Sequence, residues 1–329
     1  MIPMDSLDRG TKLAELHVHL GGSVDPAVMW EIAHSQGIRL PTKDYWKFVE
    51  LVTVGKRRKT FDDYLSLFRW TELIQSSPLA IERSVYQTIA GAYRKNNITL
   101  LELRFNPMKR NRGGEQDLDH IMMAAVRGID RAALEYPVRT GIIVCLARGF
   151  SMKMNEILVD KAVRFSARGV VGIDVAGPVA DDFHYSSYAG LFRRARREGL
   201  GLTVHAGEDE GPESVMEVIK QLEPDRIGHG VRATEDPKTM EMLVGSNIVL
   251  EVCPTSNLNT GVVKGTSGLR KILKTLKQHR VRFTINTDGP EMLKTNLRGE
   301  FEFLMREGIL DRAEVLGANR AAFGAAFVS

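Results

Sequence analysis

The chain has 329 residues, of which 43% are hydrophobic and 26% are charged, as is usual for a globular protein. Its 45 basic and 41 acidic side chains leave a net charge of +4, too small a bias to indicate nucleic-acid binding. No apolar run reaches the ~18 residues of a membrane helix, and no secretory signal is visible near the N-terminus. The two cysteines, Cys145 and Cys253, lie in apolar runs, so we expect buried thiols in a reducing, cytoplasmic setting.

The pattern of residues in the N-terminal quarter of the chain predicts one strand followed by helices. Residues 13–20 alternate and then reach a glycine turn, which is typical of a strand end. Residues 37–77 are expected to form a helical insertion that covers a pocket, because apolar residues recur at helical spacing over residues 60–68. The basic run 56–59 within it is interpreted as a solvated loop.

From residue 78 onward, helical and strand patterns alternate regularly. Helices are predicted at 78–96, 117–135, 153–167, 185–198, 212–221, 236–245 and 267–278. Strands are predicted at 98–105, 139–147, 170–175, 202–204, 225–230, 248–253 and 281–288. With the first strand this makes eight, which favours a closed (β/α)₈ TIM barrel in a single domain, residues 1–329. An open doubly wound sheet is the alternative, and it lacks the glycine-rich phosphate turn expected after its first strand.

Several predicted strands end on groups that bind metals. His17 and His19 are two residues apart in a strand and therefore face the same side. His205 ends the fifth strand and Asp288 the eighth, and barrel strands deliver their C-terminal ends to one rim. Three imidazoles and a carboxylate suit Zn²⁺ with an open position for water. Each residue alone could equally be a core histidine or a turn-capping acid, so the joint pattern carries the prediction.

Two further residues fit proton transfer at the same rim. Glu208 lies three residues beyond His205, where it is placed to shuttle a proton. His229 stands between two glycines, a pattern expected to let a substrate approach the backbone. It is a candidate for deprotonating an attacking water, with a core or capping histidine as the alternative.

Taken together, the motifs resemble those of the adenosine deaminase family. They are His17-Val-His-Leu-Gly-Gly-Ser23, His205-Ala-Gly-Glu208, Gly228-His-Gly230 and Thr287-Asp-Gly-Pro290. Segments 102–107, 172–177 and 251–256 are also similar to strand ends of that family, and the likeness runs in order from about residue 11 to 323. It implies a zinc-dependent enzyme that hydrolyses the 6-amino group of adenosine or a related purine nucleoside and releases ammonia.

The resemblance also implies roles for individual residues. One Zn²⁺ per chain would be held by His17, His19, His205 and Asp288. Glu208 would protonate purine N1, His229 would assist the attacking water, and Asp288 would also accept its proton. Substrate contacts would come from the backbone of Gly177 and from a hydrophobic cover that includes Tyr64, Leu65 and Phe68.

Two positions depart from the family pattern. Gly289 stands where the family usually has an acid that contacts N7, and Gly21 where adenosine-specific members often hold the 5′-hydroxyl with an acid. We hypothesise that Gly21 makes room for a 5′ substituent, as in methylthioadenosine, an aminofutalosine-like nucleoside or a nucleotide. Lys109, Arg110 and Arg112 would then meet an anionic tail, unless they form a solvated loop.

Other functions remain open from the sequence alone. The substrate could be adenine, or the barrel could be another metal-dependent hydrolase that cleaves an amide or ester. A third possibility is a purine-binding protein without turnover, which the glycine at position 289 would favour. The sequence leaves the oligomeric state undetermined.

Overall fold

A computed structural model describes residues 6–55, 61–111, 117–179 and 183–328. Its eight strands pair in parallel and in sequence order. They are β1 (Leu13–His19), β2 (Ile98–Phe105), β3 (Arg139–Ala147), β4 (Val170–Ala176), β5 (Gly201–Ala206), β6 (Arg226–His229), β7 (Val249–Val252) and β8 (Arg282–Ile285). A parallel bridge between Val18 and Asp288 joins the last strand end to the first. The predicted TIM barrel is therefore confirmed.

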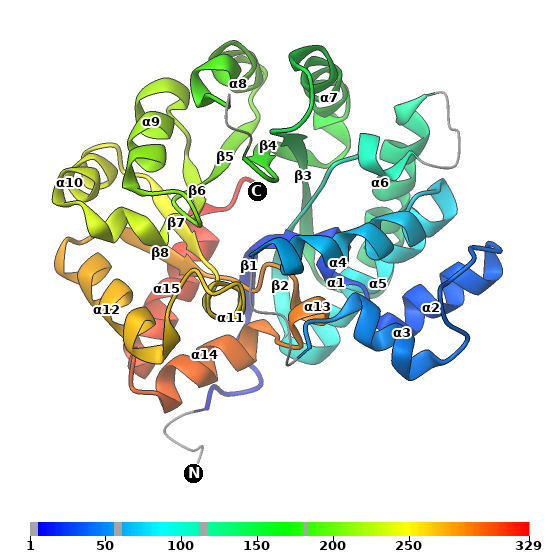
Figure 1. Cartoon of the computed structure of the whole chain (residues 1–329), viewed down its shortest axis with the longest axis horizontal. Helices are drawn as coiled ribbons and strands as arrows, with labels where there is room; N and C mark the ends of the chain where they lie inside the picture. Colours follow the sequence, from blue (N-terminus) through cyan, green and yellow to red (C-terminus); the bar gives the residue numbers. More distant parts are fainter. Residues whose placement is uncertain (1–5, 56–60, 112–116, 180–182, 329) are drawn as a thin grey trace.

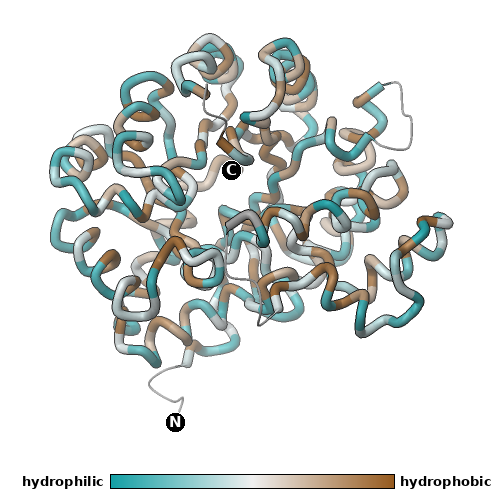
Figure 2. The backbone as a smooth tube through the Cα atoms, viewed as in Figure 1, coloured by the Kyte–Doolittle hydropathy of each residue, from teal (hydrophilic) through white to brown (hydrophobic). Residues whose placement is uncertain are grey.

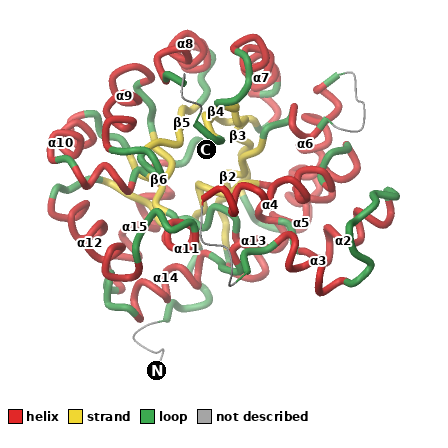
Figure 3. Tube along the Cα trace, in the orientation of Figure 1, coloured by secondary structure: helices red, strands yellow, loops and turns green. Residues whose placement is uncertain are grey.

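Helices surround the barrel: in Figure 3 the helices, in red, lie around the strands, in yellow. Those after the second strand are α6 (Leu118–Glu135), α7 (Met152–Arg164), α8 (Ala189–Arg197), α9 (Pro212–Leu222), α10 (Pro237–Gly245), α11 (Pro254–Asn259), α12 (Gly265–Gln278), α13 (Pro290–Leu293), α14 (Leu297–Arg306) and α15 (Arg312–Ala325). Short 3₁₀ turns occur at Met108–Arg110, Ser166–Arg168, Tyr185–Tyr188 and Val231–Glu235. Hydrophobic residues concentrate in the central strands and hydrophilic ones on the outer loops (Figure 2).

The connection from β1 to β2 carries several additional helices. They are α1 (Leu20–Ser23), α2 (Pro26–Ser35), α3 (Tyr45–Val52), α4 (Phe61–Ile74) and α5 (Pro78–Asn96). Of these, α3 and α4 fall within residues 37–77, and α4 crosses the barrel mouth near β1 and β2 (Figure 1). The basic run 56–59 lies outside the described residues.

Strand ends differ from the prediction where the chain turns into the site. The expected strand 281–288 stops at Ile285, and Asp288 adopts a left-handed backbone with φ 67°. Leu20, expected to end the first strand, instead begins α1. Hydrophobic alternation does not reveal these boundaries, because the residues beyond them are as buried as the strands themselves.

The C-terminal tail closes the other end of the barrel. A Cβ on Gly201 would lie 2.2 Å from Cγ of Phe327, so only glycine leaves room for this ring. The ring in turn stacks 3.6 Å from the Arg226 guanidinium, and the backbone N–H of Val328 donates to Glu102. The tail is thus bonded directly to charged groups inside the barrel.

Within the described ranges, none of the helices combines the length and apolar character needed to cross a membrane.

Candidate active site

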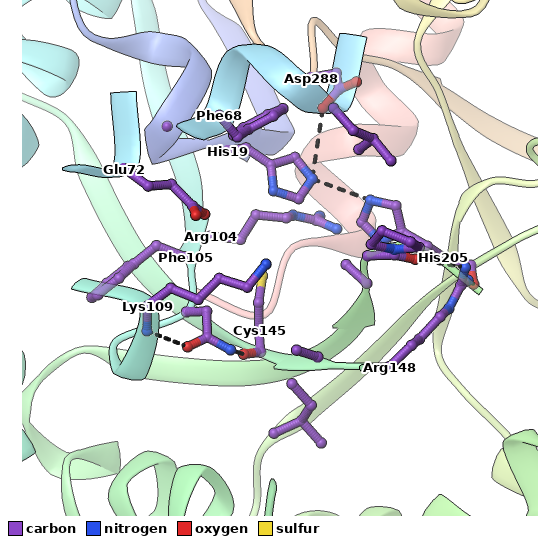
Figure 4. A pocket seen from close by; sticks show the side chains of 18 of the residues that line it. His19, Phe68, Glu72, Arg104, Phe105, Lys109, Cys145, Arg148, His205 and Asp288 are labelled. Carbon is purple, nitrogen blue, oxygen red and sulfur yellow. Dashed lines mark hydrogen bonds and ion pairs between the residues drawn. The ribbon is translucent and has the colours of Figure 1, made fainter. Parts of the chain in front are cut away.

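The imidazoles predicted to bind metal converge at the C-terminal rim of the barrel. One potential ligand atom from each of His17, His19 and His205 lies within 4.8 Å of those of the other two. The Nε2 atoms of His19 and His205 are 3.1 Å apart. Oδ1 of Asp288 is 3.6 Å from Nε2 of His19 and 3.9 Å from Nε2 of His17. Figure 4 shows His19 between Asp288 and His205.

Two carboxylates behind this cluster fix the orientation of the imidazoles. Nδ1 of His17 lies 2.7 Å from Glu251, and Nδ1 of His205 lies 3.0 Å from Asp174. A proton on each Nδ1 leaves the Nε2 lone pair facing the cluster. The buried Nε2 of His17 has no hydrogen-bond partner among the described residues. Converging lone pairs with an orphaned buried nitrogen fit a bound metal ion.

The pKa shifts of two of the imidazoles, His17 and His19, favour the neutral form that binds metals. Burial, followed by the charge of Arg104, lowers the pKa of His17 well below its usual value. Burial, followed by the charge of His205, does the same to the pKa of His19. Cys253 forms an alternative cluster with His17 and His229. Burial, followed by the charge of Asp288, raises the pKa of its thiol well above the usual range.

A buried ion-pair network supports Glu251 and Asp174 from below. Arg104 donates to Glu251 at 2.8 Å and to Asp174 at 3.0 Å. Arg226 donates to Glu251 at 2.6 Å and also bonds Glu102. Sequence reasoning missed this network. Charged residues inside otherwise apolar strands could have indicated it, because charged side chains are buried only when they are paired with opposite charges.

Asp288 is held by two hydroxyl groups. Its Oδ2 accepts hydrogen bonds from Ser256 Oγ at 2.6 Å and from Tyr64 Oη at 3.1 Å. Both donors bind the same oxygen, so Oδ1 remains directed toward the imidazoles. Burial raises the pKa of Asp288, although the Ser256 hydrogen bond opposes this.

Glu208 and His229 meet at the same rim. Burial, followed by the negative charge of Asp288, raises the pKa of Glu208 well above its ordinary value. Oε2 of Glu208 lies 3.5 Å from Nε2 of His229, whose Nδ1 is 3.0 Å from the Asn257 amide. Burial, followed by the charge of His205, lowers the pKa of His229 well below its usual value. Both shifts favour the neutral form of the group.

The glycines around His229 leave room for neighbouring side chains. A Cβ on Gly228 would lie 3.0 Å from Cε1 of His17. Gly230 has φ 66°, and a Cβ there would lie 2.7 Å from the Leu250 side chain. Packing therefore favours glycine at both positions, and the expectation that they let a substrate approach the backbone stays a prediction.

The cavity above these residues has a volume of about 240 Å³. It is lined by Gly177, Tyr64, Leu65 and Phe68, as expected, and by Arg148, which sequence reasoning missed. Gly177 has φ 105°, a conformation that favours glycine, and its carbonyl accepts from Arg148 at 3.0 Å. Arg148 also bonds the Tyr185 hydroxyl at 2.8 Å, fixing the loop after β4.

The space expected beside Gly21 is already filled. A Cβ there would lie 2.8 Å from Phe68 and 3.1 Å from Nη2 of Arg110. The side chain of Arg110 is only 3% exposed and lies 4.0 Å from Glu72, so the solvated-loop interpretation is wrong for this residue. Lys109 also lines the cavity, with Glu72, on the side away from Asp288 (Figure 4). Arg112 lies outside the described residues.

Position 289 is closed in a similar way. A Cβ on Gly289 would lie 3.3 Å from Cα of Gly22 and 3.5 Å from the Tyr64 hydroxyl. Helix α1 and the loop after β8 thus meet backbone to backbone, with Tyr64 beside them.

Comparison with known proteins places the chain in a family. The adenosine deaminase family model matches residues 12–329. The chain belongs to the adenosine deaminase family. It is 29% identical over 325 residues to the adenosine deaminase of Shewanella loihica, covering 98% of this chain and 96% of that protein. It is 32% identical over 292 residues to that of Clostridium kluyveri, covering 89% and 82%. This membership confirms the expected class, a metal-dependent aminohydrolase.

Solved structures of the same fold have different named substrates. Adenine deaminase from Arthrobacter aurescens superposes with a TM-score of 0.86 at 21% identity, covering 96% of this chain and 94% of its own. The N6-mAMP deaminase of Arabidopsis gives a TM-score of 0.84 at 22% identity, with 98% and 95% covered. An amidohydrolase from Burkhoderia ambifaria, solved with bound Zn, gives 0.81 at 21% identity, with 98% and 87% covered. At these identities the likeness shows the fold and leaves the substrate open.

Proposed function

We propose that this chain is a zinc-dependent hydrolase that removes the 6-amino group of adenosine or a related purine nucleoside as ammonia. The observation that carries the proposal is the convergence of three imidazoles and Asp288 at one rim of the barrel, beside Glu208, whose pKa is raised by burial. When bound, zinc would be held by His17, His19, His205 and Asp288 and would lower the pKa of a water at the site. The zinc in the Burkhoderia ambifaria structure supports this choice of metal.

The remaining groups supply proton transfer. Glu208 is the acid that donates to purine N1, because its raised pKa favours the protonated form. Protonation of N1 withdraws electrons from C6 and makes that carbon electrophilic. His229 is neutral and accepts a proton from the attacking water. The buried Oδ1 of Asn257 has no hydrogen-bond partner within the described parts of the chain. When the Asn257 amide is turned so that this oxygen accepts from Nδ1–H of His229, Nε2 of His229 is free to act as the base.

Water exclusion is the task of α4 in this proposal. Tyr64, Leu65 and Phe68 line the cavity from that helix, and Gly177 faces it from the loop after β4. A dry cavity strengthens the hydrogen bond from Glu208 and protects the protonated ring. The volume of about 240 Å³ lies just below the usual range for small-molecule sites, consistent with a small ligand.

A substrate with an anionic 5′ group is a second candidate. The specific observation is that Arg110 occupies the space beside Gly21 and that Lys109 lines the same cavity. Guanidinium and ammonium groups attract phosphate more strongly than they attract a hydroxyl group. The structure of a complex of ADAL with IMP, which has the same fold, supports this candidate.

The proposal is tested by measuring ammonia release and the ultraviolet shift from adenine-type to hypoxanthine-type absorbance. The zinc-loaded protein, with metal content checked, is offered adenine, adenosine, deoxyadenosine, methylthioadenosine, AMP and an aminofutalosine-type nucleoside. Turnover of any nucleoside or nucleotide supports the proposal, and the best one defines the 5′ preference, whereas turnover of adenine alone would assign the free base as the substrate. Zinc-loaded protein that binds nucleosides and releases no ammonia from any of them would be a purine-binding protein instead.

Arg110→Met separates the two candidates, with the exposed Arg193→Met as its matched control. If the substrate is anionic, Arg110→Met lowers kcat/KM for AMP far more than for adenosine. Arg193→Met leaves kcat/KM unchanged for both substrates. Equal losses for both substrates would reject the anionic candidate.

A further inference from the structure

A hydroxyl group on α4 reaches the ligand cluster from the side opposite Glu208. Glu208 follows β5 and contacts His229 at the end of β6. Tyr64 approaches Asp288, which pairs with β1 across the barrel from β5. The Tyr64 side chain lines the cavity and is buried, at 5% exposure. The cavity therefore presents polar protons on two sides of the position where the metal ligands converge.

The Tyr64 hydroxyl is not needed to satisfy Asp288. The same carboxylate oxygen already accepts from Ser256 at 2.6 Å, which is shorter than the 3.1 Å contact from Tyr64. A phenol has a single proton to donate, so it can turn to a competing acceptor without leaving Asp288 unbonded. Ser256 is not among the residues that line the cavity, whereas Tyr64 is.

Packing, rather than this hydrogen bond, holds the phenol in place. The Tyr64 ring stands edge-on to Phe68 at 5.6 Å and packs with Leu67, Met292 and Leu293. The glycine at position 289 leaves no side chain beside the hydroxyl, since its missing Cβ would lie only 3.5 Å from Oη. The phenol oxygen is thus held at the cavity wall next to a bare backbone, while its proton can still turn.

The chemistry of a 6-aminopurine matches two donors placed in this way. In the purine ring, C6 is flanked by N1 on one side and, beyond C5, by N7 on the other, and both nitrogens accept hydrogen bonds. On the proposed function, C6 faces the ligand cluster and N1 faces Glu208. N7 then faces β8 and β1, where Tyr64 lies.

We propose that the Tyr64 hydroxyl donates a hydrogen bond to N7 of the bound purine and thereby selects ring systems with a nitrogen at that position. This inference rests on the proposed function and adds a specificity-determining residue to it. The donor lies on the cover helix α4 and not on a barrel strand. Recognition of N7 therefore requires α4 to be seated over the cavity.

The test compares ligands that differ only at position 7. Dissociation constants are measured on the zinc-loaded full chain for inosine and 7-deazainosine, in which a C–H replaces N7. The variants are Tyr64→Phe and the matched control Ser256→Ala, which removes the other hydroxyl from the same Asp288 oxygen. Metal content and thermal melting check that each variant is folded and loaded.

We expect the wild type to bind inosine about ten-fold more tightly than 7-deazainosine. Tyr64→Phe should weaken inosine binding by about ten-fold and change 7-deazainosine binding by less than about two-fold. Ser256→Ala should leave the ratio between the two ligands unchanged. The same pattern is expected in kcat/KM for adenosine and 7-deazaadenosine, because comparing variants cancels the intrinsic reactivity of each ring.

Equal losses for both ligands in Tyr64→Phe would show that Tyr64 acts only through Asp288, and would overturn the inference. A wild type that binds the two ligands equally would overturn it as well. Either result leaves the proposed function intact as long as ammonia is released from adenosine. If no purine yields ammonia, the proposed function fails, and the binding ratio still decides the role of Tyr64.

Discussion

At the scale of single residues, Glu208 gives the most direct prediction. Glu208→Gln keeps a neutral hydrogen-bond donor of the same size but removes the transferable proton. We expect kcat to fall by roughly 10²–10⁴-fold, the usual contribution of a general acid, while zinc content is retained. For the wild type, activity should fall as pH rises through the raised pKa of Glu208, because the deprotonated form cannot donate. Ammonia release measured against pH, alongside metal analysis, checks both statements.

Retention of full activity in Glu208→Gln would assign the acid role to another residue. A loss of zinc in that variant would indicate a structural rather than a catalytic effect.

At the scale of elements, the close packing of β5 against the C-terminal tail can be tested by adding a methyl group at the contact. Gly201→Ala places a Cβ 2.2 Å from the Phe327 ring, so the tail must move. We expect the free energy of unfolding to fall by about 1–3 kcal/mol, as is usual for overpacked sites. Phe327→Ala in the same chain should relieve the clash, making the double variant more stable than the sum of the single changes predicts. Chemical denaturation of all four proteins measures this coupling.

Gly190→Ala serves as the control, because a Cβ at this position in α8 meets nothing within 4 Å. It should be neutral or stabilise by about 0.5–1 kcal/mol. Additive effects of Gly201→Ala and Phe327→Ala would contradict the proposed packing.

At the scale of the whole molecule, two buried acids predict how stability changes with pH. Burial raises the pKa of Glu300, on α14, to about 7, despite hydrogen bonds from Thr255 and Thr295. Burial likewise raises the pKa of Glu15, on β1, to about 8. Between the unfolded value of 4.5 and these folded values, the folded chain binds more protons than the unfolded chain. The contribution of these two groups to the stability of the folded chain should therefore be greatest below pH 4.5 and should decline as the pH rises from 4.5 to the folded pKa of each group.

Glu300→Gln removes one of the two contributions. Each group contributes a slope of at most about 1.4 kcal/mol per pH unit, so the variant should lose less stability than the wild type up to about pH 7. Denaturation at matched zinc concentration across this range provides the measurement. Parallel curves for the two proteins would show that Glu300 is not protonated in the folded state.

The sequence by itself determined the order of elements, the barrel and the family. Hydrophobic periodicity is local, so β2 and β3 were predicted with their observed bounds. The ligand candidates were also visible, because a closed parallel barrel brings strand ends such as His17, His205 and Asp288 to one rim regardless of loop detail.

Only the tertiary structure decided what surrounds those residues. The partners of Glu251, Arg104 and Arg226 come from different strands, and no local pattern records which charges meet across a barrel. Gly21 illustrates the same limit, because the space it leaves is filled by Phe68 and Arg110 from distant segments. In a sequence, a glycine in place of a larger residue suggests empty space. In the folded protein, the close-packed interior fills that space with side chains from neighbouring segments.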